Sequence, residues 1–190
     1  MKLAVISGLA ACLLSTSVLA FEMSAPDGWY LEGNIGASRL SNTNYSGSAN
    51  NSGAAYNGNL GYKFMPYVAV EGGYTSYNQS KIRFNGMDIA NVSHYSYDIA
   101  AKGIWPISDC GFEIFGKLGA AHMRTKVSSV DTAIVSFTDS ANATNYYVGL
   151  GAQVNVMSEL GIVAQWQRAQ GSNSTGAEDF YSIGLAFIFV

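Results

Sequence analysis

Polar and apolar residues alternate along most of the chain in segments of about ten residues, the length and period of a strand that crosses a membrane within a barrel. In the first segment, Leu31 and Ile35 belong to an apolar row opposite the polar residues Glu32 and Asn34. Such alternation places one row on each face of a strand. The pattern predicts eight strands, at residues 29–40, 55–64, 67–77, 95–105, 112–124, 145–156, 159–168 and 180–189.

The connections between these segments are short and long in turn. The short turns are residues 65–66, 106–111 and 157–158, and the long polar links are residues 41–53, 78–93, 125–144 and 169–179. Bacterial transmembrane barrels have short periplasmic turns and longer extracellular loops. The sequence therefore predicts an all-β fold, an eight-stranded antiparallel up-and-down transmembrane β-barrel.

Alternation alone does not decide which row faces inward, because a soluble lipocalin-like barrel would turn its apolar rows to the inside. Here the polar rows are rich in Gly, Ala and Ser, which suits a narrow lumen, and the apolar rows carry bulky side chains. Aromatic residues gather near the strand ends, as in the girdles of a membrane barrel. We predict one girdle near the short turns, made of Trp29, Phe64, Trp105 and Phe112, and a second near the long loops, made of Tyr74, Tyr95, Tyr146, Trp166 and Tyr181.

The N-terminus has the parts of a secretory signal peptide. Lys2 precedes an apolar run, and Ala20 stands at a position typical of signal-peptidase cleavage. We therefore predict a cleaved signal peptide at residues 1–20, an outer-membrane β-barrel domain at 21–190 and a location in the bacterial outer membrane. A less favoured alternative is a lipoprotein signal in which Cys12 carries the lipid.

Composition agrees with a membrane barrel. Charged residues make up 12% of the chain, against about a quarter in soluble domains. A net charge of -3 without a basic stripe gives no reason to expect a nucleic-acid partner. The two His lie far apart in the sequence, so we expect no metal and no cofactor. After signal cleavage Cys110 is the remaining cysteine, so we expect no internal disulfide. We expect a monomer, with a disulfide from Cys110 to another chain as a minor alternative.

Several short motifs, in their order and spacing, resemble the transmembrane domain of outer membrane protein A. They are Trp29-Tyr30, Gly61-Tyr62-Lys63, Pro66-Tyr67-Val68, Glu71-x-Gly73-Tyr74, Ala101-Lys102-x-x-x-Pro106-Ile107-Ser108-Asp109 and Phe115-Gly116-Lys117-Leu118-Gly119. The peptidoglycan-binding domain of that family has no counterpart in this sequence, so the resemblance narrows to small stand-alone barrels of the opacity and outer-membrane-protein-X type. For these it implies adhesion, serum resistance or envelope integrity.

The resemblance also extends to the last strand. Phe187 and Phe189 are similar to the aromatic C-terminal signal that the barrel-assembly machinery reads. Val190 follows them here, where the family usually stops at or near the aromatic residue.

Charged residues on the polar rows predict a network inside the lumen. The predicted members are Glu71, Lys102, Lys117, Glu32 and Gln153. Glu71 and Lys102 fall at similar depths on neighbouring strands, and the other three fall near the same layer. Buried charges are tolerated when they are paired, so we expect this network to stabilise the lumen.

A gated pore is an alternative role for the same residues. The resemblance implies that a Glu matching Glu71 exchanges partners between a Lys matching Lys102 and an Arg on the seventh strand, and that this exchange gates a narrow pore. In this sequence the seventh-strand position is Val163.

A second alternative is an enzyme that modifies lipid A. His94-Tyr95-Ser96 has the spacing found in outer-membrane lipid A deacylases, and Asp98 offers an acid to orient the His. The triplet falls on the row assigned to the lumen or at the loop margin, whereas a lipid-processing site must open to the membrane. We therefore predict that the chain is not an enzyme.

The long loops are the remaining place for function, because loops on a rigid scaffold commonly carry binding sites. Residues 41–53 are rich in Asn, Ser and Gly. Residues 125–144 carry Val127, Val130, Ile134, Val135 and Phe137 at semi-alternating spacing, so a hairpin that extends above the membrane is expected there. The leading hypothesis is a non-enzymatic barrel with a structural or surface role and with loops available for adhesion. The expected partners are outer-membrane lipid and lipopolysaccharide, the barrel-assembly machinery and a host surface.

Overall fold

A computed structural model describes residues 26–41, 52–77, 80–84, 87–108, 111–129, 138–172 and 176–189. These residues form the strands β1 (Gly28–Ser41), β2 (Ser52–Met65), β3 (Val68–Ser76), β4 (Ser80–Phe84), β5 (Met87–Ser108), β6 (Phe112–Ser129), β7 (Thr138–Asn155), β8 (Leu160–Ala169) and β9 (Ala177–Phe189). The predicted signal peptide, Cys110 and Val190 lie outside the described residues. Within the described part of the chain, no helix is long and apolar enough to cross a membrane.

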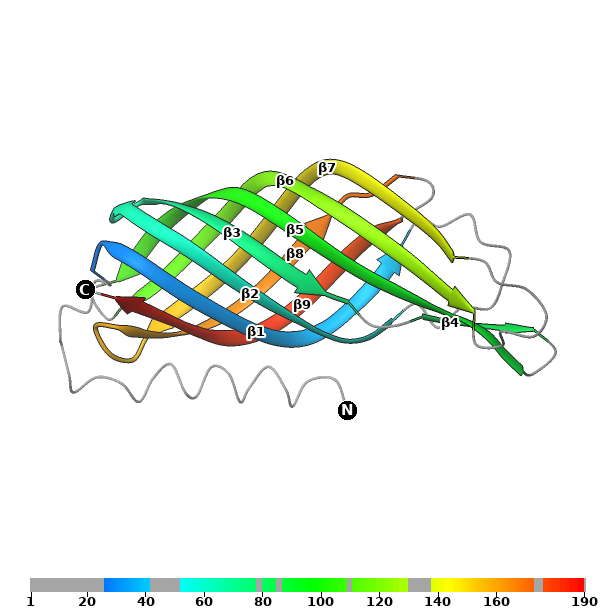
Figure 1. The fold of residues 1–190 in the computed structure, drawn as a ribbon. Coiled ribbons are helices and arrows are strands. Elements are labelled where there is room, and N and C mark those ends of the chain that lie inside the picture. The colour runs from blue at the N-terminus through cyan, green and yellow to red at the C-terminus, as the bar shows by residue number, and fades with distance from the viewer. Residues whose placement is uncertain are drawn as a thin grey trace.

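Eight of these strands close into a barrel (Figure 1). Neighbouring strands follow the order β3-β2-β1-β9-β8-β7-β6-β5, and a pairing between β3 and β5 closes the ring. Each of these pairings is antiparallel. Among the described strands, β4 pairs with β5 alone and stands outside the ring. The predicted eight-stranded up-and-down barrel is therefore confirmed.

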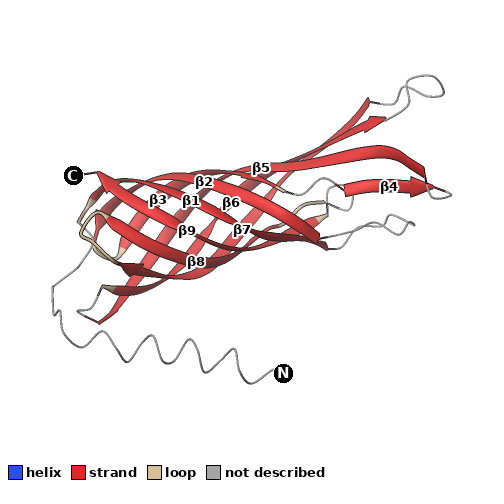
Figure 2. Ribbon diagram, turned by 90° about the horizontal axis from the view of Figure 1, so that it is seen from below, coloured by secondary structure: helices blue, strands red, loops and turns tan. Residues whose placement is uncertain are grey.

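The strands are longer than predicted at the end of the barrel that carries the long connections. Residues 78–93, predicted as a polar link, contain β4 and the first part of β5, which pair as a hairpin. β6 and β7 continue as a pair as far as Ser128 and Thr138, in agreement with the hairpin expected for residues 125–144. Beyond the predicted membrane band, no lipid requires one row of a strand to be apolar. The strands can therefore stay paired there without the alternation of apolar and polar residues by which a strand is recognised in the sequence. Figure 2 shows these extensions projecting from one end of the barrel.

The two rows of each strand lie on opposite sides of the barrel wall. On β1, Leu31 and Ile35 are 53% and 68% exposed, whereas Glu32 and Asn34 are buried. The same division holds on β2, where Leu60 is exposed. Bulky apolar side chains therefore cover the outside and polar side chains fill the lumen, which is the reverse of a soluble lipocalin-like barrel.

Candidate functional site

Four charged side chains meet at the centre of the lumen. Lys117 Nζ lies 2.6 Å from Glu71 Oε1 and 3.5 Å from Glu32 Oε1. Lys102 Nζ lies 3.3 Å from Glu32 Oε2. All four side chains are buried, and they come from β1, β3, β5 and β6. The central layer is thus a set of linked ion pairs that joins strands from opposite parts of the barrel wall.

Neutral donors complete the surroundings of the two glutamates. Glu32 Oε1 accepts hydrogen bonds from the amide nitrogens of Asn34 at 2.8 Å, Asn59 at 3.1 Å and Gln165 at 2.9 Å. The Tyr30 hydroxyl donates to Glu71 Oε2 at 2.8 Å. Hydrogen bonds to the charged form reduce the free-energy cost of burying a carboxylate. Because the donors come from several strands, these bonds also link the strands of the barrel wall.

The partners within the network differ from the prediction in two respects. Glu71 contacts Lys117 instead of Lys102, because the lumen is narrow enough for a side chain of β6 to reach across to β3. Gln153 lies apart from the central layer, where its Nε2 donates to Asn155 Oδ1 at 2.7 Å. Gln165 takes part in the central layer in its place. Sequence reasoning missed Gln165, although its inward-facing position on β8 marks it as a lumenal residue.

Apolar side chains pack inside the lumen on both sides of the charges. On the side of the short turns, the buried cluster consists of Tyr30, Ala69, Ile104, Phe115, Val163, Ala186 and Ile188. On the side of the long loops, two buried clusters consist of Ala100, Ala121, Met123, Tyr147 and Ala169, and of Ala55, Tyr77 and Phe180. Val163, the position at which the resemblance implies an Arg, is fully buried in the first cluster.

Asp98 is an acid of the lumen whose carboxylate has no hydrogen-bond donor among the described residues. It is buried, and neither of its carboxylate oxygens has a hydrogen-bond partner among the described residues. A Cβ placed on Gly73 would lie 2.8 and 2.9 Å from these two oxygens and against Asn59 Oδ1. The Asn59 amide is oriented by Asn57, which donates to Asn59 Oδ1 at 2.9 Å. Oxygen acceptors of Asp98 and Asn59 therefore converge beside Gly73.

We expect Asp98→Asn to raise the free energy of unfolding by about 1–3 kcal/mol, because the new amide can donate to Asn59 and the layer loses an unpaired carboxylate. The measurement is an equilibrium urea titration of the protein folded in lipid vesicles. Asn34→Asp, which adds a carboxylate beside Glu32, serves as the control and is expected to have the opposite sign. An Asp98→Asn variant less stable than the parent would contradict this reading of the site.

The possible catalytic triplet does not form a nucleophile and base pair. Ser96 Oγ lies 3.0 Å from the Tyr77 hydroxyl, and His94 Nδ1 lies 3.2 Å from Thr125 Oγ1. His94 and Ser96 are both buried inside the barrel. An activated serine needs a direct hydrogen bond to its base, and here each residue is bonded to a different partner. Among the described residues, no three His, Cys, Asp or Glu side chains are placed to hold a metal ion.

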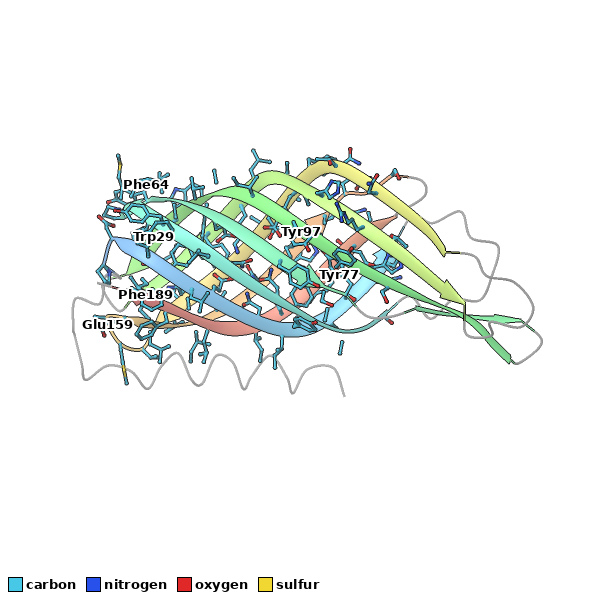
Figure 3. The ribbon with its side chains drawn as sticks, in the orientation of Figure 1. Trp29, Phe64, Tyr77, Tyr97, Glu159 and Phe189 are labelled. Carbon is cyan, nitrogen blue, oxygen red and sulfur yellow. The ribbon has the colours of Figure 1, made fainter. Side chains whose placement is uncertain are left out.

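The predicted girdle residues all lie on outward-facing positions. Near the short turns, Trp29, Phe64 and Trp105 are each more than half exposed, and Figure 3 shows Trp29, Phe64 and Phe189 together at that end. Near the long loops, Tyr74 and Tyr95 form an aromatic cluster with Tyr97, a residue not predicted as part of the girdle. The remaining predicted members, Phe112, Tyr146, Trp166 and Tyr181, are half-buried or exposed on β6, β7, β8 and β9.

The last strand closes the barrel against the first. Phe187 pairs with Leu31 and Phe189 with Trp29, and the two phenyl rings lie 5.2 Å apart on the outer surface. Both rings are therefore accessible from outside the wall. Their role as an assembly signal stays a prediction.

The comparisons with known proteins agree with this geometry. The family model described as outer membrane protein beta-barrel domain matches residues 8–189, so the chain belongs to this family. An uncharacterized protein of Haemophilus influenzae is 24% identical over 148 residues, which cover 78% of this chain and 80% of that protein.

Solved structures of small outer-membrane barrels share the fold. Ail, the attachment invasion locus protein of Yersinia pestis, is 19% identical with a TM-score of 0.58, over 86% of this chain and 100% of that one. Neisserial surface protein A is 12% identical with a TM-score of 0.60, over 85% and 97%. The N-terminal β-barrel domain of OprF from Pseudomonas aeruginosa is 15% identical with a TM-score of 0.58, over 86% and 98%. The chain is thus a small barrel of the outer membrane protein A type, located in the bacterial outer membrane.

Proposed function

We propose that this protein is a non-enzymatic scaffold of the outer membrane that presents its extracellular loops to host or envelope partners. The observation that supports the proposal is the packed lumen, in which ion pairs lie between apolar clusters. Since the interior offers neither an open path nor an assembled catalytic group among the described residues, the loops and outer rim remain for contact with partners. We further propose export through a signal peptide cleaved after residue 20, insertion by the barrel-assembly machinery and a monomeric state.

The sequence of the third long loop supports this proposal. Residues 130–137 include Val130, Ile134, Val135 and Phe137, an unusual concentration of apolar residues for a connection predicted to lie outside the membrane. Exposed apolar residues commonly mark a surface that binds a partner. Ail, one of the solved structures with this fold, has been crystallised with the heparin analogue sucrose octasulfate. Sulfated polysaccharides are therefore suitable first probes for the loops of this chain.

The test is a cell-binding assay with the full chain displayed on a non-adherent bacterial host. One variant replaces residues 130–137 with a Gly-Ser linker of equal length, which leaves the paired parts of β6 and β7 intact. A matched control replaces residues 42–51, which are rich in Asn, Ser and Gly, in the same way. A gel that separates folded from heat-denatured barrel checks that all forms reach the membrane folded.

We expect the parent and the 42–51 variant to bind host cells or immobilised heparin, and the 130–137 variant to lose about nine-tenths of that binding or more, because hot-spot residues dominate interface energy. If no form binds and the only phenotype is envelope weakness on deletion of the whole barrel, the adhesive role is wrong and the structural role stands alone.

A further inference from the structure

The acids inside the barrel outnumber the lysines that could pair with them. Among the described residues, the buried acids of the lumen are Glu32, Glu71, Asp98, Glu113 and Glu178, and the buried lysines are Lys63, Lys102 and Lys117. Lys102 contacts Glu32, Lys117 contacts Glu32 and Glu71, and Lys63 Nζ lies 3.9 Å from Glu113 Oε1. Asp98 and Glu178 are therefore the two acids that have no lysine partner among these residues.

Asp98 faces an amide oxygen whose orientation is fixed. Asn57 Nδ2 donates to Asn59 Oδ1 at 2.9 Å, and Asn59 Nδ2 donates to Glu32 Oε1 at 3.1 Å. Turning the Asn59 amide over would break both hydrogen bonds, so its oxygen stays beside Gly73 together with the two oxygens of Asp98. Two acceptors form a hydrogen bond only when one of them carries a proton, and a neutral carboxylic acid provides that donor.

The described residues around Asp98 provide no unshared cation that would hold it as a carboxylate. From the central layer, Glu71 and Glu32 are near enough to repel a charged Asp98, and Lys117 already contacts both glutamates. The other titratable side chains of this region are each bonded to another residue, Tyr147 to Gln167, Tyr77 to Ser96 and His94 to Thr125. A buried acid without a partner generally stays neutral, because burying its charge costs more than keeping its proton.

Glu178 has similar surroundings nearer the long loops. It is 2% exposed, and its Oε2 has no hydrogen-bond partner among the described residues. Its partners on the neighbouring strands, Leu40 on β1 and Ala169 on β8, are buried and apolar. Arg39 and Arg168 lie one residue before them, on the outward rows of the same strands. Neither arginine therefore shares the inward row of Glu178.

The acid–base behaviour of Glu178 agrees with this geometry. Glu178 lies beyond the girdle residue Tyr181, in the part of β9 outside the predicted membrane band. Burial, and after it the negative charge of Asp179, raises the pKa of Glu178 to about 8. Tyr77 is the titratable group that faces both Glu178 and Asp98. A raised pKa stabilises the folded state at low pH, and this stabilisation declines above the usual carboxyl range and is lost as the pH passes about 8.

We propose that Asp98 and Glu178 are neutral acids in the folded barrel and make the half of the lumen toward the long loops a pH-sensitive element. While both carry protons, Asp98 donates to Asn59, and Glu178 lies uncharged among apolar side chains. When they ionise, two negative charges without partners are left in the lumen and the folded state is destabilised. The gain in stability expected above for Asp98→Asn is the gain over the ionised form, so it grows as the pH rises.

The test compares the parent with Asp98→Asn, Glu178→Gln and the double variant, each folded in lipid vesicles and unfolded with urea across a pH series. Both amides keep the shape of the neutral acid and cannot ionise. One proton held by the folded protein alone changes the unfolding equilibrium constant by about tenfold per pH unit. Between about pH 6.5 and 8.5 we expect this constant to rise by about tenfold or more in the parent relative to the double variant, with each single variant intermediate.

A matched control and a second readout accompany the titration. Glu159→Gln changes an exposed glutamate at the end of the barrel that carries the short turns (Figure 3), and it is expected to keep the pH dependence of the parent. Infrared spectroscopy of the folded samples detects the carbonyl stretch of protonated carboxylic acids apart from the carboxylate bands, without any unfolding step. We expect this band in the parent at neutral pH, a weaker band in each single variant and its loss in the double variant.

Several outcomes would overturn the proposal. They include a parent whose pH dependence equals that of the double variant and a neutral-pH spectrum of the parent without the acid band. Replacing sodium ions with N-methylglucamine tests whether a metal ion balances the charge instead. If this replacement destabilises the parent but not the double variant, the acids are ionised and the proposal is wrong. A Glu159→Gln variant that loses as much pH dependence as the double variant would attribute the effect to surface charge.

Discussion

We expect Lys117→Met to lower the free energy of unfolding of the barrel by about 3–5 kcal/mol, the usual cost of removing one partner from a buried ion pair. Lys117 is in contact with both Glu71 and Glu32, and all three side chains are buried. Methionine fills a similar volume, so the loss would come from Glu71, which is left without its cation, and from Glu32, which is left with Lys102 alone. Urea titration of the folded fraction in lipid vesicles measures the effect.

A double-mutant cycle identifies the cause of that loss. Lys117→Met/Glu71→Gln removes the lysine together with one of its two carboxylates, so it is expected to recover part of the stability. Lys102→Met removes a single ion pair and is expected to cost less, because Glu32 keeps Lys117 and its amide donors. A Lys117→Met variant as stable as the parent would show that the central ion pairs do not support the fold.

The membrane-spanning part of the fold could be predicted from the sequence because lipid imposes a visible pattern. On β1, the apolar row of Leu31 and Ile35 must face lipid, so it alternates with residues that face the lumen. This constraint ends at the girdle near the long loops. β4 and the outer part of β5 could therefore not be predicted, since hydrogen-bonded pairing alone leaves no periodic trace in the side chains. The extension of β6 and β7 could be predicted, because residues 125–144 keep a partly alternating pattern.

The members of the central network could also largely be predicted, but their partners could not. The polar row of each alternating strand faces inward, and the sequence shows which residues belong to it. These rows include Glu32, Glu71, Lys102 and Lys117. The contacts between these residues across the lumen depend on how the strands are staggered around the barrel. This stagger is fixed only when the barrel closes, so it cannot be read from the local sequence pattern. For this reason Gln165, and not Gln153, reaches Glu32.

The packed lumen is the basis of the proposed scaffold role, and it has an expected electrical consequence. Hydrophobic constrictions stop ions by losing their water. Ile104, Phe115 and Ile188 belong to the apolar cluster on the side of the short turns, and Met123 and Tyr147 belong to a cluster toward the loops. We expect the folded protein to give no steady unit conductance, in contrast to an open porin of equal protein load.

The most direct test is a planar-bilayer recording of the full-length folded protein. Insertion is verified by the shift of the folded form on a gel of the reconstituted material, so that silence reflects a closed barrel and not an empty membrane. We expect baseline current for the parent and for Glu71→Ala. A stable unit conductance in the parent that disappears in Glu71→Ala would contradict a barrel without an ion path and would favour the gated pore.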